Sequence, residues 1–238
     1  PDRAGPVCPS ARRCCGCQLQ ALSYEKQLEL KAEKVRGNLE RIGGFANLPM
    51  EPIIGMKDPC HYRNKAQFPV GRNRDGKIVT GFYAGRTHSI IENRDCVRGV
   101  PQNREILDRV IDYMETYDIS PYDEVTGKGL IRHIFTRYGY HTGEIMVCIV
   151  ANGSRLPHQQ ELVKALREIP GMTSITLNIN KNRNNVILGE KIQVLWGQEY
   201  ITDKIGDISY QISPLSFYQV NPQQTWELYS KALEYADL

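Results

Sequence analysis

Hydrophobic residues near the start of the chain recur at the spacing of an α-helix. Between residues 23 and 42 the apolar positions advance in alternating steps of four and three residues. They are Leu28, Ala32, Val35, Leu39 and Ile42. Such steps place side chains in one stripe along a helix. Ser23 is a suitable N-cap, and Gly43 with Gly44 is a suitable stop. The pattern predicts an amphipathic helix that docks one face and exposes the others to solvent.

The pattern changes to that of β-strands after residue 61. Strand-like runs over 62–70 and 77–83 flank Arg74-Asp75-Gly76, and Asp-Gly between such runs is a strong hairpin signal. The other expected elements are strands over 87–91, 131–138, 144–151 and 174–179, short strands up to 212, and helices over 101–117, 158–168 and 221–238. We therefore predict an α+β fold, with a central antiparallel β-sheet and helices packed on it.

Composition is that of an ordinary globular protein. The chain of 238 residues is 41% hydrophobic and 24% charged. No apolar run approaches the roughly 18 residues that cross a bilayer, and the first residues lack the apolar stretch of a secretory signal. We expect a cytoplasmic protein without a membrane partner, and we expect it to be a monomer.

Positive charge is concentrated in one segment. Residues 61–104 hold nine Lys and Arg against three Asp and Glu, a local excess of six positive charges, whereas the whole chain has a net charge of +3. Such a segment is typical of a surface that binds the phosphates of a nucleic acid. A solvated basic face would give the same pattern. The candidates for phosphate contacts are Arg63, Lys65, Arg72, Arg74 and, in the next predicted hairpin, Arg132.

Seven cysteines are many for a protein of the reducing cytosol. Cys8, Cys14 and Cys17 have the spacing Cys-x5-Cys-x2-Cys in one short loop. Three thiolates from a loop, completed by a remote fourth, suit tetrahedral zinc or a four-iron four-sulfur cluster. The spacing favours the cluster, because zinc sites usually combine two close pairs. Zinc and free thiols remain the alternatives.

The remote fourth ligand has two candidates. Cys96 follows directly on the basic segment and is the first choice, while Cys60 precedes a predicted strand and is the second. Cys148 lies inside an apolar strand, where a small core residue is expected. Cys15 could replace its neighbour Cys14, but the x2 spacing to the third cysteine favours Cys14.

Five short motifs in a fixed order resemble a known family. They are Cys8-x5-Cys14-x2-Cys17-Gln18-x-Gln20, Tyr62-Arg63-Asn64-Lys65, Asp95-Cys96 with Pro101-Gln102, Arg132-His133, and Ser213-Pro214-x-x-Phe217-x-Gln219-Val220-Asn221. Together they resemble bacterial 23S rRNA (uracil-5-)-methyltransferases, the iron-sulfur-containing RNA 5-methyluridine methyltransferase family. Each motif alone is of low specificity, but together they span nearly the whole chain.

The resemblance implies a division into four parts. They are a cysteine loop over 1–22, the amphipathic helix over 23–45, an α+β RNA-recognition domain over 46–212, and the start of an S-adenosylmethionine-dependent methyltransferase domain over 213–238. Family members also carry a small N-terminal β-barrel and a Rossmann-like catalytic domain. The resemblance therefore implies that this chain is the portion between them, ending at the first helix of the Rossmann-like domain.

The resemblance also assigns roles to residues. Gln219 is expected to hydrogen-bond S-adenosylmethionine, and Phe217 to stack beside the flipped uracil, although Phe217 could instead be a core aromatic. A four-iron four-sulfur cluster would be bound by Cys8, Cys14, Cys17 and Cys96. The nucleophile and the general base match no position of this chain. The cluster cysteines favour 23S rRNA processing over tRNA methylation, and a non-catalytic iron-sulfur module for RNA binding or electron transfer is the competing class.

Overall fold

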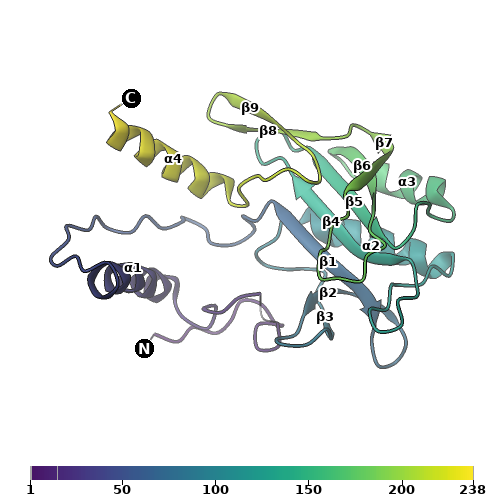
Figure 1. The fold of residues 1–238 in the computed structure, drawn as a ribbon, viewed down its shortest axis with the longest axis horizontal. Coiled ribbons are helices and arrows are strands. Elements are labelled where there is room, and N and C mark those ends of the chain that lie inside the picture. Colours follow the sequence, from purple (N-terminus) through teal and green to yellow (C-terminus); the bar gives the residue numbers. More distant parts are fainter. Residues whose placement is uncertain (1, 15, 238) are drawn as a thin grey trace.

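A computed structural model describes residues 2–14 and 16–237 (Figure 1). A seven-stranded sheet forms its centre, in the order β3-β2-β1-β4-β5-β6-β7, beside a separate two-stranded hairpin of β8 and β9. The helices are α1 (Tyr24–Arg41), α2 (Gln102–Thr116), α3 (Gln159–Arg167) and α4 (Pro222–Ala236). The strands are β1 (Lys65–Arg72), β2 (Ile78–Tyr83), β3 (Ile90–Glu92), β4 (Ile131–Tyr138), β5 (Ile145–Ala151), β6 (Met172–Ile179), β7 (Lys191–Gly197), β8 (Ile201–Ile205) and β9 (Ile208–Ile212).

Both predicted hairpins are confirmed. β1 pairs antiparallel with β2 around the Asp75-Gly76 turn, with Val70 opposite Thr80, and β4 pairs antiparallel with β5. The sheet is mixed, however, because β5 and β6 are parallel and α3 connects them. The prediction of an antiparallel sheet holds for every other strand pair and is wrong at this one, since a parallel pair needs a crossover connection and the chain provides one in α3.

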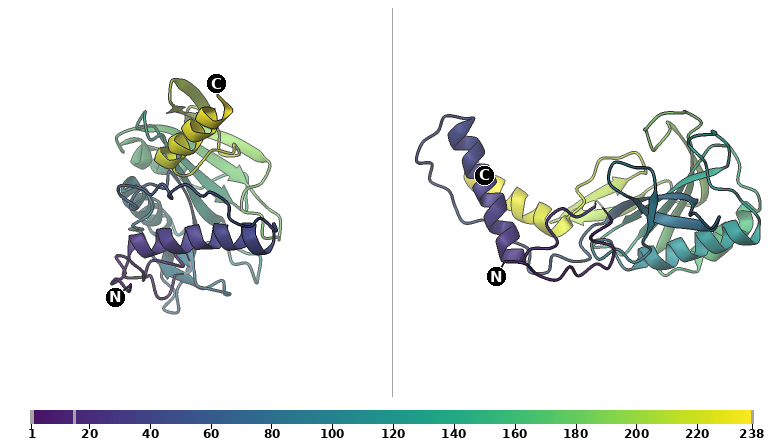
Figure 2. Two further views of the ribbon diagram at one scale, coloured as in Figure 1. Left: turned by 90° about the vertical axis from the view of Figure 1, so that its left-hand side faces the viewer. Right: turned by 90° about the horizontal axis from the view of Figure 1, so that it is seen from below.

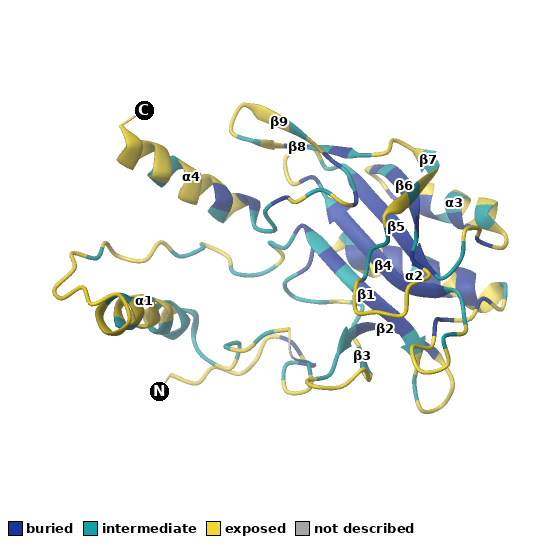
Figure 3. Ribbon diagram, in the orientation of Figure 1, coloured by how far each residue is buried: buried dark blue, intermediate teal, exposed yellow. Residues whose placement is uncertain are grey.

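Alternate residues of β5 face two different cores. Ile145, Val147 and Ile149 belong to the cluster that packs under α2 and α3. Met146 and Cys148 face the other side, where residues of β8, β9 and the following loop cover them. The strand is apolar throughout because both of its faces are covered, as the dark blue centre of Figure 3 shows.

α1 and α4 lie beyond the edge of this double-sided core (Figures 1 and 2). α1 begins as predicted, since the Ser23 hydroxyl accepts a hydrogen bond from the Lys26 N–H at 3.3 Å. The prediction that its apolar stripe docks was wrong for the described residues. None of its residues is buried, and Val35 is 50% exposed. Within the described part of the chain, no helix has both the length and the hydropathy to cross a membrane.

Candidate functional site

The loop between β9 and α4 alternates its aromatic side chains between core and solvent. Tyr218 is buried against the central sheet, and its hydroxyl donates to the Asp203 carboxylate at 3.2 Å. The adjacent Phe217 points away and is 86% exposed. Phe217 is therefore not a core aromatic. An exposed aromatic face of this kind is free to stack on a nucleobase.

Asn64 fixes the far end of this loop. Its main-chain N–H donates to the Val220 oxygen at 3.0 Å, and its side-chain amide donates to the Gln219 oxygen at 3.1 Å. Asn64 is buried just ahead of β1, and its main-chain oxygen accepts a hydrogen bond from the Tyr138 N–H. The half-buried Gln219 is thus held at a defined position by the start of the central sheet.

Arg137 fixes the near end of the loop. This residue of β4 is buried, and its guanidinium donates to the main-chain oxygen of Ser216 and, at 3.5 Å, to that of Pro214. Burial lowers the pKa of Arg137 to about 10, so the group is still charged at neutral pH. Asn64 and Arg137 together hold the loop that carries Phe217 and Gln219.

Three cations, Arg63, Lys65 and Arg98, lie close to Asn64 and Arg137, the two residues that hold the loop. Burial lowers the pKa of Arg63, and the charge of Arg98 lowers it further. Burial likewise lowers the pKa of Lys65, as do the charges of Arg137 and Arg63. Arg63, Lys65 and Arg98 take part in no ion pair between described residues. Cations that lack an acidic partner and repel one another are suited to bind an anion such as a phosphate. We call Arg63, Lys65 and Arg98 the basic cluster, and Arg137 is not part of it because its guanidinium already binds the main chain of the loop.

The other predicted phosphate contacts divide into two kinds. Arg72 and Arg74 are exposed at the tip of the β1–β2 hairpin, where Arg72 donates to the Gly76 oxygen at 2.6 Å. Arg132 is buried and donates to the main-chain oxygens of Asn180 and Asn182. The structure thus corrects the interpretation of Arg132, because its guanidinium already binds main-chain groups inside the protein.

Sequence patterns missed three residues of this site. Asn64 belongs to the Tyr62-Arg63-Asn64-Lys65 motif, which by itself indicates no contact for this side chain. Arg98 is visible in the sequence only as one positive charge of the basic segment. Arg137 carried a usable signal, because a charged residue inside a strand that is otherwise buried is rare without a partner. That partner is the main chain of the loop.

Four cysteines surround one small cavity. Cys8, Cys14, Cys17 and Cys96 all line a space of about 20 Å³. Burial raises the pKa of the Cys17 thiol, the charge of Arg98 lowers it, and the three other thiols raise it. The Gly16 N–H points to the Cys14 sulfur at 3.4 Å, and the Asn93 amide to the Cys8 sulfur at 3.7 Å. We call this space the cysteine cavity.

The remaining cysteines lie elsewhere. Cys60 lines a separate, larger pocket. Cys148 is fully buried in the sheet, which confirms it as a core residue, and burial raises its pKa to about 12. Cys15 lies outside the described residues.

The donor set of the cysteine cavity fits a thiolate-bound metal group. Four sulfurs from two segments face one space, and N–H groups point at two of them, as is usual around iron-sulfur clusters. Among residues 2–14 and 16–237, no three His, Cys, Asp or Glu side chains form a ready metal-binding group. The binding of a metal here therefore stays a prediction.

Known proteins similar to this chain are RNA methyltransferases. An uncharacterized RNA methyltransferase of Halalkalibacterium halodurans is 46% identical over 239 residues, which cover 100% of this chain and 52% of the relative. One from Caldanaerobacter subterraneus is 47% identical over 99% of the chain and 52% of its own length. The chain thus spans about half the length of the curated relatives it matches. No family model matches.

One solved structure with a similar fold is that of a tRNA methyltransferase that acts at carbon 5 of uracil. The tRNA (uracil-54, C5)-methyltransferase of Pyrococcus abyssi, in complex with S-adenosyl-L-homocysteine, superposes with a TM-score of 0.76 at 28% identity. The match covers 93% of this chain and 50% of that protein. Fold and sequence thus support the coarser part of the resemblance, that to RNA methyltransferases acting at carbon 5 of uracil, and they do not test the iron-sulfur cluster or the 23S rRNA substrate.

Proposed function

We propose that this chain is the RNA-recognition part of an S-adenosylmethionine-dependent RNA methyltransferase that acts at carbon 5 of uracil. One observation carries the proposal: exposed Phe217 stands on a loop held by Asn64 and Arg137, and Asn64 is flanked in sequence by Arg63 and Lys65 of the basic cluster. A uracil that is swung out of its stack needs an aromatic face and fixed phosphates on either side of it. The relatives named RNA methyltransferases support RNA methylation, and the superposed tRNA (uracil-54, C5)-methyltransferase supports carbon 5 of uracil as the target.

Carbon 5 of uracil is a poor nucleophile and must be activated. A cysteine thiolate that adds to carbon 6 turns the base into an enolate, which attacks the methyl group of S-adenosylmethionine. A general base then removes the proton from carbon 5, and the cysteine is eliminated. We assign the nucleophile to no cysteine of this chain. In this scheme Phe217 stacks on the base, the basic cluster holds the phosphates, and Gln219 binds S-adenosylmethionine.

We propose that Cys8, Cys14, Cys17 and Cys96 hold a four-iron four-sulfur cluster. Its contribution would be a cross-link and not electron transfer, because methyl transfer needs no redox step. The cysteine loop is irregular and mostly exposed, so a metal group would fasten it to the segment that follows β3. Arg98 lines the same cavity, and the cross-link would thereby also position one member of the basic cluster.

Two RNA classes are candidates for the substrate. The four cysteines favour 23S ribosomal RNA, by analogy with the iron-sulfur-containing members of the family. Transfer RNA is the second candidate, because the superposed archaeal protein is a tRNA methyltransferase. A cytoplasmic, monomeric protein is consistent with either substrate and stays a prediction.

The experiment is a methylation assay with the polypeptide encoded by the complete reading frame that contains residues 1–238. Labelled S-adenosylmethionine is supplied with 23S rRNA or with tRNA, and the products are digested to nucleosides. We expect 5-methyluridine in 23S rRNA. Its appearance in tRNA alone would select the second substrate. No 5-methyluridine in either RNA would leave a non-catalytic RNA-binding module as the function.

A further inference from the structure

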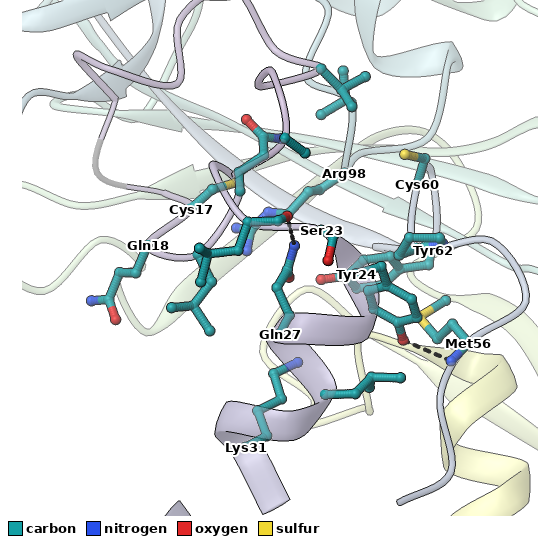
Figure 4. Close-up of a pocket in the computed structure, with 18 of the residues that line it drawn as sticks. Cys17, Gln18, Ser23, Tyr24, Gln27, Lys31, Met56, Cys60, Tyr62 and Arg98 are labelled. Carbon is teal, nitrogen blue, oxygen red and sulfur yellow. Dashed lines mark hydrogen bonds between the residues drawn. The ribbon is translucent and has the colours of Figure 1, made fainter. Parts of the chain in front are cut away.

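A pocket of about 680 Å³ lies between the cysteine loop, the start of α1 and the irregular segment 53–62 (Figure 4). It adjoins the cysteine cavity, and Gly16, Cys17, Gln20, Val97 and Arg98 line both spaces. Its size is within the range of pockets that bind small organic molecules. The roles proposed for the basic cluster and for the Phe217 loop assign no ligand to this pocket.

Two tyrosines give the pocket aromatic walls. Tyr24, the first residue of α1, and Tyr62 are both half-buried, and Figure 4 places their rings on the same side of the pocket. The hydroxyl of Tyr24 accepts a hydrogen bond from the Met56 N–H at 2.7 Å. This bond ties α1 to the irregular segment, so the Tyr24 ring is held in place. The pocket therefore offers a fixed aromatic surface before any ligand arrives.

The polar groups of the pocket are amides and cations. Arg98 and Lys31 supply positive charge, and the amides come from Gln18, Gln20 and Gln224. The amides of Gln27 and Asn221 also line the pocket, but they already donate to the Leu22 oxygen and the Met56 sulfur. No Asp or Glu among the described residues lines the pocket. The Gln20 oxygen and the Arg98 Nε are buried without a hydrogen-bond partner. An aromatic surface with amide edges, cations and no carboxylate suits a nucleobase joined to a phosphate.

The pocket also lies on the route that the proposed function gives to the RNA. Asn221 lines it and follows Phe217 by four residues. Arg98 belongs both to the pocket wall and to the basic cluster. An RNA strand whose phosphates follow the basic cluster away from Phe217 thus reaches the mouth of this pocket.

We propose that this pocket binds a second unstacked nucleotide of the RNA, distinct from the base that meets Phe217. The inference rests on the proposed function and adds a subsite to it. The base of this nucleotide stacks on Tyr62, the amides hydrogen-bond its edge, and Arg98 binds its phosphate. A strand held at two unstacked bases is fixed in register, which phosphate contacts alone do not achieve.

The test separates stacking from charge with two RNA probes. The first is an oligouridylate of about 12 nucleotides, a length within the usual site sizes for single strands. The second is an abasic ribose-phosphate chain of the same length, which keeps the phosphates and lacks the bases. Fluorescence anisotropy measures the affinity of the 238-residue chain for each probe. The variants are Tyr62→Leu, Tyr62→Phe, Phe217→Leu and, as a control for loss of an exposed aromatic outside the pocket, Tyr235→Leu.

We expect Tyr62→Leu to weaken oligouridylate binding about tenfold, in line with the loss of one base–aromatic stack. Binding of the abasic probe should change less than about twofold, and Tyr62→Phe and Tyr235→Leu should behave as wild type. Equal weakening of both probes by Tyr62→Leu would mean that the ring only supports the fold, and this would overturn the inference. If Phe217→Leu weakens oligouridylate binding and Tyr62→Leu does not, the proposed function stands and the second subsite is refuted. If the chain binds neither probe, the second subsite is refuted, and the methylation assay decides the proposed function independently.

Discussion

The side-chain amide of Asn64 donates a hydrogen bond of 3.1 Å to the main-chain oxygen of Gln219, across 155 residues of sequence. The main-chain N–H of Asn64 makes a second bond, of 3.0 Å, to Val220. Two of the five sequence motifs therefore meet in space. The motif that contains Asn64 positions the main chain of the motif that contains Gln219. It thereby positions Gln219, the residue proposed to bind S-adenosylmethionine.

Asn64→Ala should destabilise the protein by about 1–3 kcal/mol, because the Gln219 oxygen loses a buried donor. Urea unfolding followed by circular dichroism measures the change. Asn38→Ala on exposed α1 is the control and should cost less than about 0.5 kcal/mol. Equal stability of the two variants would show that the Asn64–Gln219 bond does not hold the loop.

Gln219→Ala should weaken S-adenosylmethionine binding by about 1–3 kcal/mol, since it leaves the ligand with an unpaired polar group. Calorimetry on the polypeptide from the complete reading frame measures this. The 238-residue chain alone should bind S-adenosylmethionine poorly or not at all. Tight binding by the chain alone, or an unchanged affinity in the Gln219→Ala polypeptide, would contradict the role proposed for this residue.

Purification without oxygen should give a brown protein with broad visible absorption, as thiolate-bound iron-sulfur clusters do. Single replacements by Ser at Cys8, Cys14, Cys17 or Cys96 should bleach it. Cys60→Ser and Cys148→Ser are the controls and should keep the colour, because neither residue lines the cysteine cavity. A colourless protein with one bound zinc that survives the change at Cys96 would refute the assignment.

Replacing both Arg72 and Arg74 by Ala should weaken binding to any RNA. The slope of log affinity against log salt should fall by about two charge units, because two exposed phosphate contacts are lost. The matched control removes the same charge from α3, through Lys164→Ala with Arg167→Ala, on the opposite side of the sheet from Phe217. Identical slopes for wild type and the hairpin variant would mean that these arginines are only solvated.

His133 should make stability depend on pH. Burial, followed by the charge of Arg132, lowers its pKa from 6.5 to about 4, and its Nδ1 has no hydrogen-bond partner. His133 is therefore protonated below pH 6.5 in the unfolded chain, but only below about pH 4 in the folded protein. The contribution of neutral His133 to the free energy of unfolding is complete above pH 6.5. It declines by about 3 kcal/mol at most as the pH falls to about 4. Urea unfolding of His133→Gln should be less dependent on pH than that of wild type or of the exposed control His141→Gln.

Local signals predicted most of the regular structure. The Asp75-Gly76 turn, the Ser23 cap and the alternating or continuous apolar runs each act over a few residues, so the sequence contains them directly. The parallel pairing of β5 and β6 could also have been predicted, because a strand, a helix and a strand follow one another over 144–179 and this order is typical of a parallel pair. The hairpin signals in the rest of the sheet favoured an antiparallel arrangement instead.

The docking of α1 was mispredicted for a different reason. An apolar stripe indicates a face that can be buried but does not say what buries it. Leu28 packs near Gly55, while Val35 and Ile42 remain exposed in this structure. The basic segment was similar: its total charge could be counted, but only the fold separates the hairpin arginines from the basic cluster and from buried Arg132.

The two faces of the sheet are completed at different times during synthesis. The strands β4 and β5 end by Ala151, yet Ile201, Ile212 and Tyr218 cover their second face. At about 5–20 residues per second, the ribosome needs several seconds to add this cover, and until then the face that holds Met146 and Val150 is open to solvent. A polypeptide shortened before Ile201 would keep this apolar surface permanently open, so aggregation during expression would be its expected fate.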